Sequence, residues 1–97
     1  MSWRVIIRPK AEADIREARL WYESQHAGLG DDLVAEIGHA IQLLEAQRER
    51  RPICYRSFRR LLTQRFPYKL FYRVEGDRVI VFRVLHVKQD HPRHLDS

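Results

Sequence analysis

The hydrophobic pattern changes its period near the middle of the chain, and this change limits the folds open to it. In the first half, apolar residues recur three and four positions apart, as on one face of an amphipathic helix. From Phe58 onwards the pattern becomes typical of β-strands. With 97 residues in all, we expect one domain over residues 1–97, with helices and a sheet sharing its core and residues 88–97 as a tail.

Two helices are predicted in the first half. The first begins at Pro9, because proline is preorganised for the first helical turn, and ends at Gly28 and Gly30. Its buried stripe is Ala11, Ile15, Ala18 and Tyr22. The second begins at Asp31-Asp32, where carboxylates favour the helix N-terminus, and is closed by Pro52. Its buried stripe is Leu33, Ile37, Ala40, Ile41 and Leu44.

The remaining elements are predicted strands. They cover Trp3–Ile7, Phe58–Phe66, Tyr68–Glu75 and Arg78–Val87, with Gly76-Asp77 as a tight hairpin turn. The order is β-α-α-β-β-β. The fold class is therefore α+β, with a helical hairpin packed on one face of a mainly antiparallel sheet.

The predicted hairpin of residues 68–87 has two unlike faces. If Glu75 lies opposite Arg78, one face is apolar in seven of eight positions and should bury the helices. It consists of Tyr68, Leu70, Tyr72, Val74, Val79, Val81, Arg83 and Leu85. Arg83 should then pair with Asp14 or Glu17, or reach past the sheet edge.

The other face mixes apolar and basic side chains and has no predicted helix to cover it. It consists of Lys69, Phe71, Arg73, Glu75, Arg78, Ile80, Phe82, Val84 and His86. Such a face suggests a surface that another molecule covers. The alternative is that the C-terminal tail folds over it.

The charge is divided between the two halves of the chain. Residues 1–50 carry 7 basic and 9 acidic side chains, a net charge of −2, whereas residues 51–97 carry 11 basic and 4 acidic, a net charge of +7. The positive charge thus belongs mainly to the predicted sheet. It predicts an anionic partner, either nucleic acid or an acidic protein segment.

Several classes of protein are excluded. The single cysteine, Cys54, rules out an internal disulfide framework and suits the reducing cytoplasm. No apolar run approaches the roughly 20 residues of a membrane span. No metal site or cofactor is expected, since His91 and His94 lack further ligands nearby.

Two longer segments resemble the toxins of the ParE/RelE superfamily. They are residues 57–74, SFRRLLTQRFPYKLFYRV, and residues 79–86, VIVFRVLH. The predicted helical hairpin fits as well, through residues 13–18, Trp21-Tyr22 and Gly28-Leu29-Gly30. The resemblance implies the cytoplasmic toxin of a type II toxin–antitoxin pair, held in a hetero-oligomer by an acidic antitoxin, ParD-like or similar.

The superfamily contains two activities. ParE-like toxins act on DNA gyrase, and RelE-like toxins cut messenger RNA on the ribosome. Cleavage by a 2′-hydroxyl needs a proton acceptor, a proton donor and positive charge on the phosphate, and the resemblance offers Lys69, Arg73 and His86 for these roles. However, the Arg59-Arg60 pair, Phe66-Pro67-Tyr68 and Val84-Leu85-His86 look more like the ParE type associated with plasmid stabilisation.

We therefore predict a gyrase inhibitor that acts by binding rather than as an enzyme. The first alternative is a ribosome-dependent endoribonuclease. Further alternatives are a basic nucleic-acid-binding module and an inactive toxin. The residues predicted to contact the partner are Arg59, Arg60, Arg65, Lys69, Phe71, Arg73, Phe82 and His86.

Overall fold

The computed structural model describes residues 4–47, 52–89 and 95. Two helices are followed by a sheet, as predicted. The elements are β1 (Arg4–Ile7), α1 (Pro9–Gln25), α2 (Leu29–Gln47), β2 (Ile53–Tyr55), β3 (Phe58–Leu62), β4 (Tyr68–Glu75) and β5 (Arg78–His86). The short strand β2 was not predicted, and β3 ends at Leu62 instead of Phe66. Trp3, His91 and His94 lie outside the described residues, as does most of the predicted tail.

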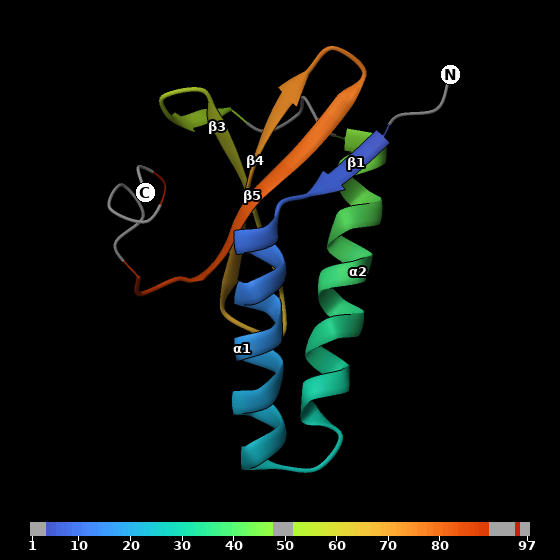
Figure 1. Ribbon diagram of the computed structural model, residues 1–97, viewed down its shortest axis with the longest axis vertical. Coiled ribbons are helices and arrows are strands. Elements are labelled where there is room, and N and C mark those ends of the chain that lie inside the picture. The colour runs from blue at the N-terminus through green and yellow to red at the C-terminus, as the bar shows by residue number, and fades with distance from the viewer. Residues whose placement is uncertain (1–3, 48–51, 90–94, 96–97) are drawn as a thin grey trace.

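The five strands form one mixed sheet in the order β1-β5-β4-β3-β2. The strands from β2 to β5 are antiparallel to their neighbours, but β1 pairs with β5 in parallel, from Arg4 opposite Arg78 to Ile7 opposite Val81. The last strand, β5, thus pairs with the first strand, β1. Figure 1 shows β1 beside β5, and α1 and α2 side by side.

The loop between the helices is fixed by one carboxylate. Glu23 of α1 accepts hydrogen bonds from the backbone N–H groups of Gly28 (2.9 Å) and Gly30 (3.0 Å). Gly28 has φ +90°, a left-handed conformation that favours glycine. At Gly30 a Cβ atom would lie 2.6 Å from the Arg19 carbonyl oxygen, so only glycine lets α2 approach α1 this closely.

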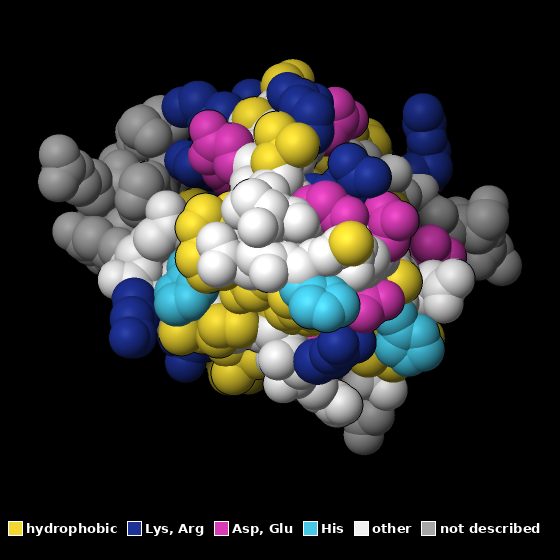
Figure 2. All heavy atoms as spheres, turned by 90° about the horizontal axis from the view of Figure 1, so that it is seen from below, with side chains coloured by type: hydrophobic (Ala, Val, Ile, Leu, Met, Phe, Trp, Pro, Cys, Tyr) yellow, Lys and Arg dark blue, Asp and Glu magenta, His cyan; other side chains and the backbone are white. Residues whose placement is uncertain are grey.

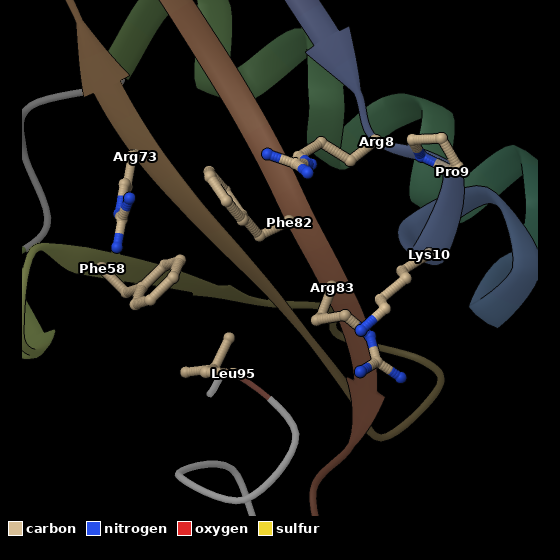
Figure 3. Close-up of a pocket in the computed structure, with 8 residues that line it drawn as sticks. All are labelled: Arg8, Pro9, Lys10, Phe58, Arg73, Phe82, Arg83 and Leu95. Carbon is tan, nitrogen blue, oxygen red and sulfur yellow. The ribbon is translucent and has the colours of Figure 1, made fainter. Parts of the chain in front are cut away.

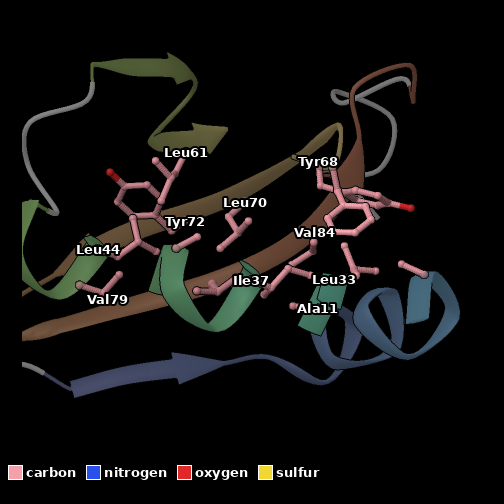
Figure 4. Packing of buried hydrophobic residues seen from close by; sticks show 14 residues of the cluster. Ala11, Leu33, Ile37, Leu44, Leu61, Tyr68, Leu70, Tyr72, Val79 and Val84 are labelled. Carbon is pink, nitrogen blue, oxygen red and sulfur yellow. The ribbon is translucent and has the colours of Figure 1, made fainter. Parts of the chain in front are cut away.

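The main core lies between the helices and one face of the sheet (Figure 4). Most of the residues of the two predicted stripes are buried, and Ile15, Tyr22 and Ile41 are partly buried against the same cluster. The buried residues are Ala11, Ala18, Leu33, Ile37, Ala40, Leu44, Leu61, Phe66, Tyr68, Leu70, Tyr72, Val79, Val81 and Val84.

A β-bulge in β5 corrects the predicted faces of the hairpin. Tyr72 lies opposite Val81 but Phe71 lies opposite Arg83, so Phe82 is an extra residue in β5. An extra residue reverses the alternation of every side chain that follows it. Leu85 and Arg83 were therefore wrongly placed on the helix-covered face, and Val84 and His86 wrongly on the other.

The face of the sheet turned away from the helices is called here the far face. It has its own small cluster of buried side chains, made by Phe58, Phe71 and Leu85. Phe82 and Leu95 pack against this cluster and are partly buried. The bulge thus supplies an apolar floor on the side of the sheet where the sequence predicts a partner.

Candidate functional site

A pocket of ≈ 250 Å³ opens beside this apolar floor (Figure 3). It combines aromatic rings with several cationic side chains, which come from the β1–α1 junction, β3, β4 and β5. The lining residues are Arg8, Pro9, Lys10, Phe58, Arg73, Phe82, Arg83 and Leu95. We call it the arginine pocket.

The bulge and the parallel strand position two sides of the arginine pocket. The ring of Phe82, at the bulge, meets Phe58 edge-on, with centroids 5.1 Å apart and planes at 82°. Beyond the last β1 pair, the Arg8 N–H donates to the Val81 carbonyl at 3.0 Å. This bond holds Arg8 beside β5, with its guanidinium carbon 4.9 Å from the Phe82 ring centre.

Arg73 of β4 forms the third side. Its guanidinium carbon lies 4.3 Å from the ring centre of Phe58 and 4.9 Å from that of Phe82. Such cation–π contacts contribute about 0.5–2 kcal/mol each. The Nε–H of Arg73 is buried and has no hydrogen-bond acceptor among the described residues, although a buried donor without an acceptor costs about 1–3 kcal/mol.

Arg83, by contrast, is fully engaged by a carboxylate from α1. Its Nε and Nη2 donate to the two carboxylate oxygens of Asp14 at 2.7 and 2.8 Å. Asp14 also accepts a hydrogen bond from the backbone N–H of Val84 at 3.0 Å. This N–H lies on the edge of β5 beyond the last residue paired with β1, so the carboxylate takes the place of a strand partner. These hydrogen bonds raise the pKa of Arg83. The predicted partnership of Arg83 with Asp14 is confirmed.

The remaining cations of the pocket have no such partner. Within the described part of the chain, Arg8, Lys10 and Arg73 form no ion pair. The end of the molecule formed by the α1–α2 loop is different, because acidic, basic, hydrophobic and histidine side chains are interspersed there (Figure 2). The arginine pocket therefore has an excess of positive charge that this end lacks.

Five of the residues predicted to bind a partner lie on the far face: Arg60, Lys69, Phe71, Arg73 and Phe82. Phe71 is only 1% exposed and belongs to the floor. Partial burial and the charge of Arg60 lower the pKa of Lys69. Arg73 and Phe82 enter the arginine pocket, whereas Lys69 lies four residues along β4 from Arg73, about 13 Å at ~3.3 Å per residue.

The other three predicted partner residues lie elsewhere. Arg59 is paired with Tyr72 on the helix-covered side of the sheet. His86 is on that side too, with its ring 5.5 Å from that of Tyr68, and its Nδ1 accepts the Lys88 N–H at 3.1 Å. Arg65 lies in the β3–β4 turn, where it pairs with Asp32 of α2 at 3.2 Å.

The structure therefore does not bring Lys69, Arg73 and His86 together. Two of them share the far face at opposite ends of β4, and the third lies across the sheet. Sequence reasoning missed Arg8, Lys10, Phe58 and Leu95 as residues of the site. Arg8 and Lys10 flank Pro9, where β1 gives way to α1, and only the parallel pairing of β1 with β5 carries them to the pocket.

No group of three or more histidine, cysteine, aspartate or glutamate side chains in the described ranges is placed to hold a metal ion. Neither α1 nor α2 is long and apolar enough to cross a membrane.

The fold is similar to that of chains in two solved structures of toxin–antitoxin systems. A chain of the structure described as "Chromosomal ParDE TA system from P. aeruginosa" superimposes with a TM-score of 0.81 at 21% identity, over 90% of this chain and 98% of that one. A chain of the RelBE2 toxin–antitoxin complex from Mycobacterium tuberculosis gives 0.60 at 20% identity, over 89% and 99%. At these identities both show the fold. No curated protein matches significantly.

The family of this chain is shown by a match of its sequence to a family model. The model of the family "ParE toxin of type II toxin-antitoxin system, parDE" matches residues 5–91. The chain belongs to this family, and it is a type II toxin. The superfamily expected from the sequence motifs is thereby confirmed, together with its ParE branch.

Proposed function

We propose that this toxin acts in the cytoplasm by binding DNA gyrase, and that an acidic antitoxin neutralises it by covering the far face. The observation that carries the proposal is the composition of that face. Arg60 and Arg73 on this face form no ion pair within the described ranges, and they lie beside an apolar floor, which suits binding. Lys69, Arg73 and His86, the side chains considered for RNA cleavage, lie apart from one another.

The separation of Lys69, Arg73 and His86 argues against acid–base catalysis by these side chains. A general base must come within hydrogen-bond reach of the proton that it removes, and a general acid must reach the leaving group in the same complex. Lys69 and Arg73 are about 13 Å apart along their strand, and His86 faces the helices. The lowered pKa of Lys69 would help a base, but no second titratable side chain of the candidate set accompanies it.

The far face also supports the antitoxin partner. The two solved structures named above are described as a toxin–antitoxin system and a toxin–antitoxin complex. An acidic segment would place carboxylates against Arg8, Arg60 and Arg73, and charge-assisted hydrogen bonds of this kind are stronger than neutral ones. Segments that fold on binding can also cover the large area of an exposed sheet face.

The target is tested by comparing two reconstituted reactions. The purified toxin should block supercoiling by purified gyrase without ribosomes, and it should leave messenger RNA intact on translating ribosomes. Cleavage of the messenger that disappears in a Lys69→Ala variant, with gyrase unaffected, would replace the proposal by the ribonuclease alternative. Absence of both effects, together with growth that continues on induced expression, would indicate an inactive toxin.

The antitoxin is tested by calorimetry with the small acidic protein expected from the neighbouring gene. Binding should persist at moderate salt and weaken as salt rises, because surface charges are screened. Failure to bind at moderate salt would reject this part of the proposal. Strongly salt-dependent binding of DNA or RNA without a protein partner would favour the nucleic-acid-binding alternative.

A further inference from the structure

We propose that the arginine pocket is a receptor for a carboxylate side chain of an acidic peptide, with Arg73 as the main ligand-binding residue and Arg8 as its companion. An aliphatic side chain of the same peptide would pack against Phe82 and Leu95, which are partly buried beside the pocket. Only the physiological source of the peptide, an antitoxin, rests on the proposed function.

The molecule itself shows how an arginine at this site holds a carboxylate. Arg83, which lines the same pocket, grips Asp14 side-on through Nε and Nη2 at 2.7 and 2.8 Å. Arg73 carries the same pair of donors on the next strand, but its Nε–H has no acceptor within the described ranges. A carboxylate from a second molecule would complete for Arg73 the arrangement that Asp14 completes for Arg83.

The aromatic rings favour a carboxylate over a nucleotide. Stacking of a nucleobase needs a free ring face, and here guanidinium groups already lie over the rings. Arg73 covers Phe58 at 4.3 Å, and both Arg73 and Arg8 lie 4.9 Å from the centre of Phe82. The rings therefore hold the two arginines in place, and the charge that the arginines present is left for an anionic ligand.

The floor next to the pocket favours an aliphatic neighbour for the carboxylate. Leu95 of this chain lines the pocket and packs against the cluster of Phe58, Phe71 and Leu85. Phe58, Phe71 and Leu85 are themselves buried, whereas Phe82 and Leu95, which line the pocket, are only partly buried. A leucine beside the acidic residue of a peptide would thus bury apolar surface of Phe82 and Leu95.

The pocket is tested with the full-length chain labelled with ¹⁵N, because each arginine Nε–H gives its own NMR signal. The probe is acetyl-Leu-Glu-amide, and its matched control is acetyl-Leu-Gln-amide, which has the same shape without the charge. The Arg73 Nε–H signal should move with a dissociation constant on the order of millimolar, as expected for so small a ligand. The glutamine peptide should bind at least about ten times more weakly.

Variants separate the pocket from general surface charge. Arg73→Lys keeps the charge but lacks the side-on pair of donors, so it should weaken binding at least about tenfold, followed on the signals of Phe58 and Phe82. Arg8→Gln should weaken it less. Arg78→Lys is the control, because Arg78 on β5 pairs with Glu75 at 3.5 Å and lies outside the pocket. It should leave the affinity unchanged.

Two results would overturn the inference. One is an Arg73 signal that does not move at 50-fold the expected dissociation constant or moves equally with both peptides, or an affinity, followed on the Phe58 and Phe82 signals, that Arg73→Lys weakens no more than Arg78→Lys does. The other is tighter binding of uridine monophosphate than of the glutamate peptide, which would assign the pocket to nucleic acid. Because these measurements contain no gyrase, a failed supercoiling assay with a bound peptide would reject only the proposed target.

Discussion

Replacing Asp14 with asparagine should destabilise the fold by about 3 kcal/mol. The carboxylate makes two hydrogen bonds to Arg83 and one to the Val84 N–H, and the Asp14 and Arg83 side chains are 12% and 15% exposed. Removing one partner of a buried ion pair costs about 3–5 kcal/mol, since the other charge is left uncompensated. We take the lower end because both side chains keep some contact with solvent.

Urea and thermal unfolding followed by circular dichroism measure this loss. For a domain of this size, about 3 kcal/mol corresponds to a fall in Tm of roughly 12–24 °C. The matched control is Asp31→Asn, which breaks the pair of Arg19 and Asp31 at 3.0 Å, with side chains 45% and 73% exposed. Exposed pairs contribute at most about 1 kcal/mol, so the control should stay close to the parent protein.

A double variant tests whether the uncompensated charge of Arg83 causes the loss of stability. If the cost of Asp14→Asn comes from a stranded cation, then adding Arg83→Met should restore part of the lost stability, because no buried charge remains. An Asp14→Asn variant no less stable than Asp31→Asn would refute the argument. So would a double variant whose loss equals the sum of the two single losses, since that outcome shows no coupling between the residues.

Two further predictions concern stability: two glycine substitutions should change it in opposite directions, and the burial of Tyr68 should make it depend on pH. Gly30→Ala should lower the free energy of unfolding in urea by about 1–3 kcal/mol, because its Cβ would lie 2.6 Å from the Arg19 carbonyl oxygen. Gly38→Ala should instead raise it by up to about 1 kcal/mol, because a Cβ atom there would have nothing within 4 Å. Equal effects of the two substitutions would contradict the close packing at Gly30. Burial and the neighbouring Tyr22 raise the pKa of Tyr68 from 10.0 to about 12, so stability that is fully present below pH 10 should fall as the pH rises toward 12. Urea unfolding should show this fall reduced in Tyr68→Phe, and an unchanged fall would argue against the shift.

The local part of the fold could be predicted from the sequence. The helical stripes, the turn at Gly28 and the turn at Gly76 each depend on residues that are close in the chain, although α2 begins at Leu29 and not at Asp31. The pairing of β1 with β5 could not, because it joins Arg4 to Arg78 and no nearby residue signals it. The three-residue strand β2 is too short to show a period.

The bulge escaped prediction for a different reason. Val81, Phe82, Val84 and Leu85 are all apolar, so these four residues fit either alternation of faces, and only Arg83, which the regular alternation places on the helix-covered face, signals the bulge. Packing against α1 decides between the two, through the bond from Val84 to Asp14. The site was therefore predicted in part: Arg73 and Phe82 were found from the β4–β5 pattern, whereas Arg8 and Lys10 depend on β1.

The parallel pairing of β1 also dictates when the toxin becomes complete during its synthesis. β1 is made well before its partner in the sheet, which begins at Arg78. Contacts between such distant segments form slowly because a long loop must close first. The arginine pocket, which needs Arg8 beside β5, cannot exist until β5 has been translated. A ribosome that stalls before β5 therefore releases no fragment with the assembled site.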